Sequence, residues 1–229
     1  MLKLALASLL LAFRAIPGHA EPVDVSIVFA VDASGSVDPP IAHLQKEGHA
    51  LALEAPEVIA AIQRGYVGCI AIVYFEWSAK GAQRLVLPWS RVCDANAAAG
   101  AAQVIRDNGT SRGFGRRTSL TAAIEHSSWL LEGFDAPRKV IDICANGPNN
   151  DASNIVKARQ GALRKGHVIN AIVELDLSEP DLLRYFQNKI IGGKGSFVTS
   201  VNSPDDFAVA LRSKLIKEIS GDIATLTVR

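Results

Sequence analysis

Short apolar runs alternate with longer amphipathic segments through most of this 229-residue chain, and this order constrains the fold more than any other feature. The apolar runs predict strands at residues 23–31, 66–75, 83–89, 139–144, 167–174 and 196–201. The segments between them predict helices at about 37–63, 94–106, 119–133, 151–165 and 203–221, and a capping-box pattern at 178–181 predicts the start of another. Strands that alternate with helices of about ten or more residues give a mostly parallel sheet with helices on both faces. We therefore predict an α/β, doubly wound, Rossmann-like fold.

The third predicted strand departs from the parallel order. Only a short turn containing Gly81 separates strand 66–75 from strand 83–89. Because parallel neighbours need a long crossover, these two strands are expected to form a hairpin that leaves one antiparallel edge strand. In the absence of repeats or a second apolar core pattern, we predict one domain over residues 21–221 and a C-terminal tail over 222–229.

The first twenty residues have the features of a secretory signal peptide. A basic start at Met1-Leu2-Lys3 precedes the apolar run 4–13, and Gly18-His19-Ala20 provides a small-residue cleavage site. Arg14 interrupts the end of the apolar run, so a disordered or amphipathic N-terminus is the alternative. The run is shorter than the roughly 20 residues that a membrane span needs. We expect cleavage after Ala20, an exported protein that is periplasmic or secreted, and no membrane span in the mature chain.

The charge balance excludes some classes of partner. The chain has 24 Lys and Arg against 23 Asp and Glu, and removal of residues 1–20 takes away Lys3 and Arg14 but no acid. The mature protein is therefore nearly neutral. Nucleic acid and anionic membrane surfaces attract strongly basic proteins, so we expect neither as the main partner.

Three cysteines, Cys69, Cys93 and Cys144, are an odd number for an exported protein. At most one internal disulfide can form, and the sequence does not decide which pair would form it. Cys69 and Cys144 lie in apolar strands, so our interpretation is that the cysteines are buried free thiols that pack as small apolar groups.

A group of oxygen donors follows the first predicted strand. Asp32-Ala33-Ser34-Gly35-Ser36 offers one carboxylate and two hydroxyls at alternate positions, and such hard ligands suit a Mg²⁺-like cation. In a doubly wound sheet, ligands bind beyond the carboxyl ends of the strands at the switch in strand order. The loops at 117–119 and 145–148 can reach that place. The alternative is an Asx-type turn in which Asp32 and Ser34 only satisfy backbone donors.

This arrangement resembles the metal-ion-dependent adhesion site of the von Willebrand factor type A domain, which uses Asp-x-Ser-x-Ser, a distant threonine and a distant aspartate. The resemblance covers nearly the whole mature chain. It extends to a mostly exported bacterial branch, domain-of-unknown-function family 1194, through the segments 74–78 (Tyr-Phe-Glu-Trp-Ser), 87–90 (Leu-Pro-Trp-Ser), 117–120 (Arg-Thr-Ser-Leu) and 147–150 (Gly-Pro-Asn-Asn). It implies that a Mg²⁺ or Mn²⁺ ion is contacted, directly or through water, by Asp32, Ser34, Ser36 and Thr118.

The fifth position of the site departs from the family pattern. Where the family carries aspartate before glycine, this chain has Asn146-Gly147. Asn146 keeps a carbonyl oxygen but has no negative charge. Because affinity for divalent ions depends on ligand charge, we expect weakened metal binding, and Arg116 and Arg117 lower the attraction further.

The resemblance implies a protein-binding module, in which an acidic side chain of the partner completes the coordination of the metal. One alternative is a structural scaffold with a vestigial, metal-free site. Another is a phosphoryl-transfer or other hydrolytic enzyme, because a strand-end aspartate can also serve as a nucleophile. We expect no Gly-x-Ser-x-Gly nucleophile elbow of a serine hydrolase, and the phosphate-binding Gly-x-x-x-x-Gly-Lys-Ser/Thr motif is missing. We therefore expect no enzymatic activity.

Overall fold

The computed structural model describes residues 21–174, 180–201 and 203–221. The predicted signal peptide, the predicted tail and residues 178 and 179 of the predicted capping box lie outside these ranges. The described strands form one sheet: β1 (Val25–Asp32), β2 (Ile70–Trp77), β3 (Gln83–Val92), β4 (Lys139–Ala145), β5 (Val168–Glu174) and β6 (Val198–Val201). None of the helices in these ranges combines the length and the apolar character that a membrane span requires.

The strand order is β3-β2-β1-β4-β5-β6. β1 pairs in parallel with β2 on one side and with β4 on the other, and β5 and β6 extend the parallel part of the sheet. β3 pairs with β2 in the antiparallel direction and forms the edge. The predicted fold class is therefore confirmed, including its antiparallel edge strand. The order of winding reverses between β1 and β4, so the carboxyl ends of these two strands form the switch point.

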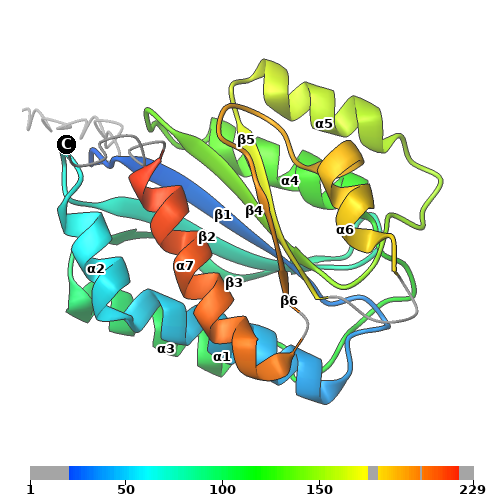
Figure 1. Cartoon of the computed structure of the whole chain (residues 1–229), viewed down its shortest axis with the longest axis horizontal. Helices are drawn as coiled ribbons and strands as arrows, with labels where there is room; N and C mark the ends of the chain where they lie inside the picture. The colour runs from blue at the N-terminus through cyan, green and yellow to red at the C-terminus, as the bar shows by residue number, and fades with distance from the viewer. Residues whose placement is uncertain (1–20, 175–179, 202, 222–229) are drawn as a thin grey trace, which may run out of the picture.

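Helices cover both faces of the sheet (Figure 1). One face carries α1 (Pro39–Glu54), α2 (Pro56–Gln63), α3 (Ala95–Asn108) and α7 (Phe207–Ser220). The other face carries α4 (Leu120–Glu132), α5 (Ile155–Arg164), the short α6 (Leu182–Tyr185) and a π-helical turn, Phe186–Ile190. Successive residues of β1, such as Phe29 and Ala30, point to opposite faces of the sheet and enter different cores. Because both of its faces are buried, the strand is a nearly continuous apolar run.

The long helix expected at 37–63 is in fact two helices. Asp38 caps α1 by accepting a hydrogen bond from the Ile41 amide (2.9 Å), but α1 ends at Glu54. Ala55 has an extended backbone (φ −62°, ψ 129°), and α2 begins at Pro56. A proline disfavours the helical conformation in the residue before it, so the chain breaks here and resumes with proline in the first turn.

The second strand begins at Ile70 rather than at residue 66. The Asp24 carboxylate accepts hydrogen bonds from the amides of Val67 and Gly68 (both 2.9 Å), and Gly68 has a φ of 74°. This turn conformation keeps residues 66–69 out of the sheet. The last predicted helix ends as expected at Gly221, and a 3₁₀ turn (Pro204–Asp206) leads into α7.

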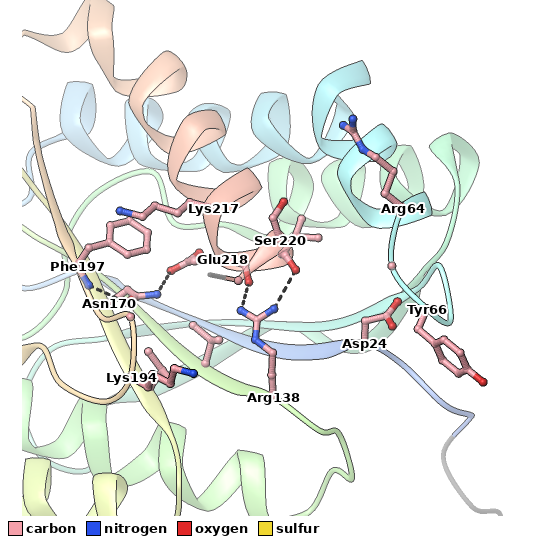
Figure 2. A pocket seen from close by; sticks show the side chains of 16 residues that line it. Asp24, Arg64, Tyr66, Arg138, Asn170, Lys194, Phe197, Lys217, Glu218 and Ser220 are labelled. Carbon is pink, nitrogen blue, oxygen red and sulfur yellow. Dashed lines mark hydrogen bonds between the residues drawn. The ribbon is translucent and has the colours of Figure 1, made fainter. Parts of the chain in front are cut away.

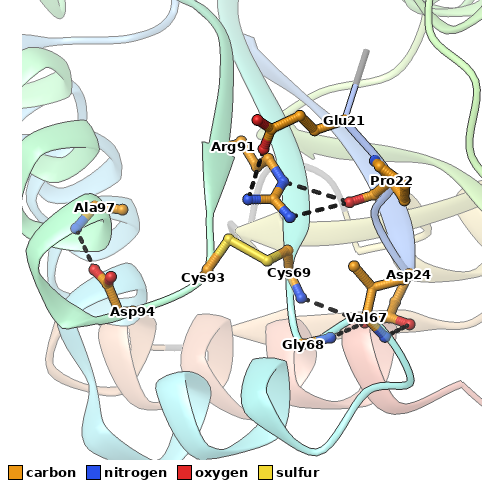
Figure 3. Close-up of a disulfide and its surroundings, with 10 residues drawn as sticks. All are labelled: Glu21, Pro22, Asp24, Val67, Gly68, Cys69, Arg91, Cys93, Asp94 and Ala97. Atoms are coloured by element: carbon orange, nitrogen blue, oxygen red, sulfur yellow. Dashed lines mark hydrogen bonds and ion pairs between the residues drawn. A yellow bond between two sulfur atoms is a disulfide. The ribbon is translucent and has the colours of Figure 1, made fainter. Parts of the chain in front are cut away.

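A disulfide joins Cys69 and Cys93, with 4.2 Å between their Cα atoms (Figure 3). Ile70 pairs with Val92 in the β2–β3 hairpin, so the residues just outside this pair face each other. Our interpretation of these two cysteines as free thiols is therefore wrong. It holds for Cys144, which is free and buried in β4.

Candidate metal site

The residues predicted to form the site come from three loops at one edge of the sheet. The loop after β1 carries the Asp32 to Ser36 motif, the residue before the α4 cap carries Thr118, and the loop after β4 carries Asn146. β1 and β4 are neighbours in the sheet, and both end at this edge. The three loops therefore meet at the switch point, where the sequence placed them.

Hydrogen bonds connect all five of the predicted residues. The Ser34 amide donates to Oδ1 of Asp32 (2.7 Å), and the Thr118 hydroxyl donates to Oγ of Ser34 (3.2 Å). Oγ of Ser34 lies 3.1 Å from Oγ of Ser36. The Ser36 hydroxyl in turn donates to Oδ1 of Asn146 (3.0 Å). The structure thus gathers the side chains into one cluster of oxygen atoms.

The Asp32 carboxylate is the only acid among the five residues, and it is completely buried. Its Oδ1 makes the Asx-type contact with Ser34, as the alternative interpretation expected, but its Oδ2 has no hydrogen-bond partner among the described residues. Burial raises the pKa of Asp32 to about 6, although the nearby amide and hydroxyl of Ser34 and the nearby backbone of Asn146 act to lower it. A buried carboxylate oxygen without a partner is costly, and a cation would remove that cost.

The chemistry of the donors fits a hard divalent cation. The cluster offers one carboxylate, three hydroxyls and one amide oxygen, and Mg²⁺ and Mn²⁺ favour such ligands. Among the described residues, no group of three or more His, Cys, Asp or Glu side chains could hold a metal. A single charged ligand agrees with the expectation of weak binding at this site.

The loop between α3 and α4 packs directly on the Asp32 motif. The amides of Gly113 and Phe114 donate to the carbonyls of Val37 (2.7 Å) and Ala33 (2.6 Å). A Cβ atom on Gly113 would lie 1.9 Å from the Ser34 carbonyl oxygen, so only glycine allows this approach. Contrary to the expectation from the sequence, residues 109–113 do match Gly-x-Ser-x-Gly. The loop joins two helices, however, and therefore does not form the strand-to-helix elbow of serine hydrolases.

The sequence did not identify the residues that hold Thr118 in place. Its amide donates to Oδ1 of Asn150 (2.8 Å), and the Asn150 amide donates back to the Thr118 carbonyl (3.0 Å). The next residue, Ser119, caps α4 and also hydrogen-bonds to Asp151. The sequence points to Asn149 and Asn150 only through the family resemblance of segment 147–150. Arg117 also contacts this segment, through the Asn150 carbonyl (3.3 Å).

Glu174 is a second acid that the sequence analysis missed. It ends β5, and the register that pairs Ala145 with Val173, continued by one residue, places it beside Asn146. Its Oε1 is buried without a hydrogen-bond partner among the described residues. Burial raises the pKa of Glu174 to about 7, and the charge of Asp32 contributes to this shift. The strand-end rule that selected Asp32 applies equally to Glu174 and could have found it.

The comparison with family models decides the family. The model for "Protein of unknown function (DUF1194)" matches residues 22–223. The chain belongs to this family. No curated protein matches this DUF1194 chain.

Solved structures show which fold the DUF1194 protein shares. It is similar to the pilus adhesin SpaC from Lactobacillus rhamnosus GG, with a TM-score of 0.63 and 12% identity over 88% of this chain. It spans only 31% of SpaC. It is also similar to the von Willebrand factor domain of the type V pili tip protein Mfa5 from Porphyromonas gingivalis, with a TM-score of 0.58 and 12% identity over 92% of this chain and 99% of that one.

A third similar structure contains a metal. Proximal thread matrix protein 1 from the mussel byssus, solved with a zinc-occupied MIDAS motif, has a TM-score of 0.63 and 16% identity over 87% of this chain and 48% of that one. At such identities the likeness establishes the fold. The DUF1194 protein therefore has the von Willebrand factor type A fold, as the sequence resemblance implied.

Proposed function

We propose that this protein is an exported binding module that holds a divalent cation, Mg²⁺ or Mn²⁺, between Asp32, Ser34, Ser36, Thr118 and Asn146. The observation that carries the proposal is the fully buried Asp32 carboxylate, whose Oδ2 has no hydrogen-bond partner among the described residues and which belongs to a cluster of uncharged oxygen donors. The cluster stands at the switch point of a von Willebrand A fold, where this fold class places its ligands.

The partner we propose is a protein that supplies an acidic side chain. Asp32, Ser34 and Thr118 are buried, whereas Ser36 is exposed and Asn146 is partly exposed, so the cluster opens to solvent on the side of these two residues. With one protein carboxylate, the bound ion would keep positive charge toward that side. A carboxylate of the partner would neutralise this charge and replace a bound water. The named roles of SpaC and Mfa5 in pili agree with a protein-binding role.

Isothermal titration calorimetry with MgCl₂ and MnCl₂ tests the metal. We expect saturable binding to the wild type and none to Asp32→Ala, while the exposed Asp135→Ala variant serves as the control and binds like the wild type. Melting temperatures measured with Mg²⁺ and with EDTA provide an independent check. If the wild type binds neither ion and melts at the same temperature in both buffers, the protein is a scaffold with a vestigial site.

The relaxation rate of water protons tests whether the partner supplies an acidic side chain to the metal. Mn²⁺ bound with an open coordination position accelerates the relaxation of water protons, and a carboxylate that takes this position lowers the effect. We expect a short glutamate-containing peptide to lower the relaxation rate of the Mn²⁺-loaded protein, and a matched glutamine peptide to leave it unchanged. Equal effects of the two peptides would contradict recognition of an acidic side chain.

A further inference from the structure

A cavity of about 670 Å³ lies at the amino ends of the parallel strands, opposite the candidate metal site at their carboxyl ends (Figure 2). Its lining includes the residue just before β1, the starts of β4 and β5, the loop that leads to β6 and the end of α7. All the parallel strands run away from it toward the Asp32 cluster. The volume falls within the range of about 300–1,000 Å³ that is typical of small-molecule sites.

Four positive side chains of the described residues line this cavity, and one of them, Arg138 just before β4, donates hydrogen bonds to the carbonyls of Glu218 and Ile219 at the end of α7. The other three come from three separate elements. Lys217 comes from α7, Lys194 from the loop before β6, and Arg64 from the end of α2. Figure 2 shows Lys194 and Lys217 on either side of Phe197 at one end of the cavity, and Arg64 and Tyr66 at the other end, with their side chains pointing away from each other. Within the described ranges, no ion pair joins any of these three cations to a carboxylate.

The two acids in the lining are already engaged by other groups. Asp24 accepts the amides of Val67 and Gly68. Glu218 is buried, and its Oε1 accepts hydrogen bonds from Lys214 (2.6 Å) and from Asn170 (2.8 Å). Burial and the charge of Asp142 raise the pKa of Glu218, and its negative charge is balanced by the ion pair with Lys214. The cavity therefore carries an excess of positive charge.

The remaining lining is largely apolar. Val140 and Val168 belong to the strands beneath the cavity. Phe197 places its ring 4.0 Å below the Lys217 ammonium, a cation–π contact that fixes a positive charge beside an apolar surface. Ligand sites in proteins combine these two features, an apolar wall and a few charged groups that orient the ligand.

We propose that this cavity binds a small organic anion that has an aromatic body and a carboxylate, phosphate or sulfonate group. The aromatic body would lie on Phe197 and Val168, and the anionic group would face Lys194 and Lys217. This site is separate from the metal cluster and does not rest on the proposed function.

The aromatic sulfonate 8-anilinonaphthalene-1-sulfonate tests the proposal, because its fluorescence increases in an apolar site. The titration is done on the folded protein in EDTA, so that the metal cluster does not contribute. We expect one molecule to bind per chain, and the Lys194→Gln and Lys217→Gln variants to bind at least fivefold more weakly. Both lysines are exposed, so these variants should fold normally. Lys157→Gln, which removes an exposed lysine on α5, is the matched control and should bind like the wild type.

A neutral analogue, N-phenyl-1-naphthylamine, separates charge recognition from apolar contact. We expect its affinity to be the same in the wild type and the lysine variants. The proposal is overturned if the sulfonate binds all four proteins equally, if it binds at many unsaturable sites, or if the lysine substitutions weaken the neutral and the anionic probe to the same extent.

Discussion

The Asn146→Asp substitution should convert a weak metal site into a stronger one. The side chain already belongs to the oxygen cluster, because the Ser36 hydroxyl donates to its Oδ1 (3.0 Å). An aspartate keeps this oxygen and adds a full negative charge. The five clustered residues would then offer a cation two carboxylates instead of one, as in the intact site of the resembled family.

The size of the gain follows from Coulomb's law. Two unit charges about 4 Å apart interact by about 1 kcal/mol in water, so a divalent ion gains about 2 kcal/mol from one added carboxylate. This corresponds to about thirtyfold tighter binding. Without metal, the new carboxylate repels Asp32 and Glu174, whose pKa values burial already raises. We therefore expect Asn146→Asp to melt lower than the wild type in EDTA and higher in millimolar Mg²⁺.

Calorimetry with MgCl₂ measures the affinity for Mg²⁺. Thermal melts in EDTA and in Mg²⁺ show whether the variant melts below the wild type without metal and above it with metal. Asn108→Asp, which adds the same charge at an exposed position at the end of α3, is the matched control. It should leave both the Mg²⁺ affinity and the effect of Mg²⁺ on the melting temperature unchanged. An Asn146→Asp protein that binds Mg²⁺ no more tightly than the wild type would refute the assignment of residue 146 to the metal site.

Three further predictions concern buried groups. Because burial raises the pKa of Asp32 from 3.8 to about 6, the metal-free fold loses stability as the pH rises from about 4 to about 6, and the loss is nearly complete at pH 7. Asp32→Asn should therefore add up to about 3 kcal/mol to the free energy of unfolding at pH 7 in EDTA, and about half as much at pH 5. Urea denaturation at both pH values measures this, and a loss of stability at both would contradict it. Replacing Cys69 and Cys93 by serine removes a cross-link with a sequence separation of 24 and should lower the free energy of unfolding by about 3 kcal/mol. Cys144→Ser removes no cross-link and should not show this loss. Lys214→Met leaves two buried carboxylates without their ion-pair partner and should cost about 3–5 kcal/mol, a loss absent from the exposed Lys157→Met variant.

The sequence predicted most of the fold because each strand was an apolar run and each crossover was long enough for a helix. It also predicted the five clustered residues, because the carboxyl ends of parallel strands share one edge. Local chemistry set the boundaries that it missed. Pro56 breaks the first long helix, and the amides at the start of β2 bind the Asp24 carboxylate.

The polar groups within the core were harder to predict. Lys214 lies on the apolar face of α7, where the pattern indicated only core residues, and it is buried because Asp142 on β4 and Glu218 pair with it. The sequence contains one indication of this buried polar group: two polar residues, Asp142 and Asn170, lie inside apolar strands. Their partners come from a helix far along the chain, so only the tertiary structure brings these groups together.

The placement of Asp24 and Gly221, near the ends of the described part of the chain, has a mechanical consequence. Residues near both described ends, Asp24 and Gly221, line the cavity at one edge of the sheet, whereas the Asp32 cluster lies at the other edge. If the protein is held near its ends and a partner pulls at the cluster, the tension runs along β1, which is bonded to a parallel strand on each side. Extraction of β1 would then have to shear both ladders at once rather than open them one bond at a time. A fold arranged in this way resists force in the direction in which a tethered binding protein would experience it.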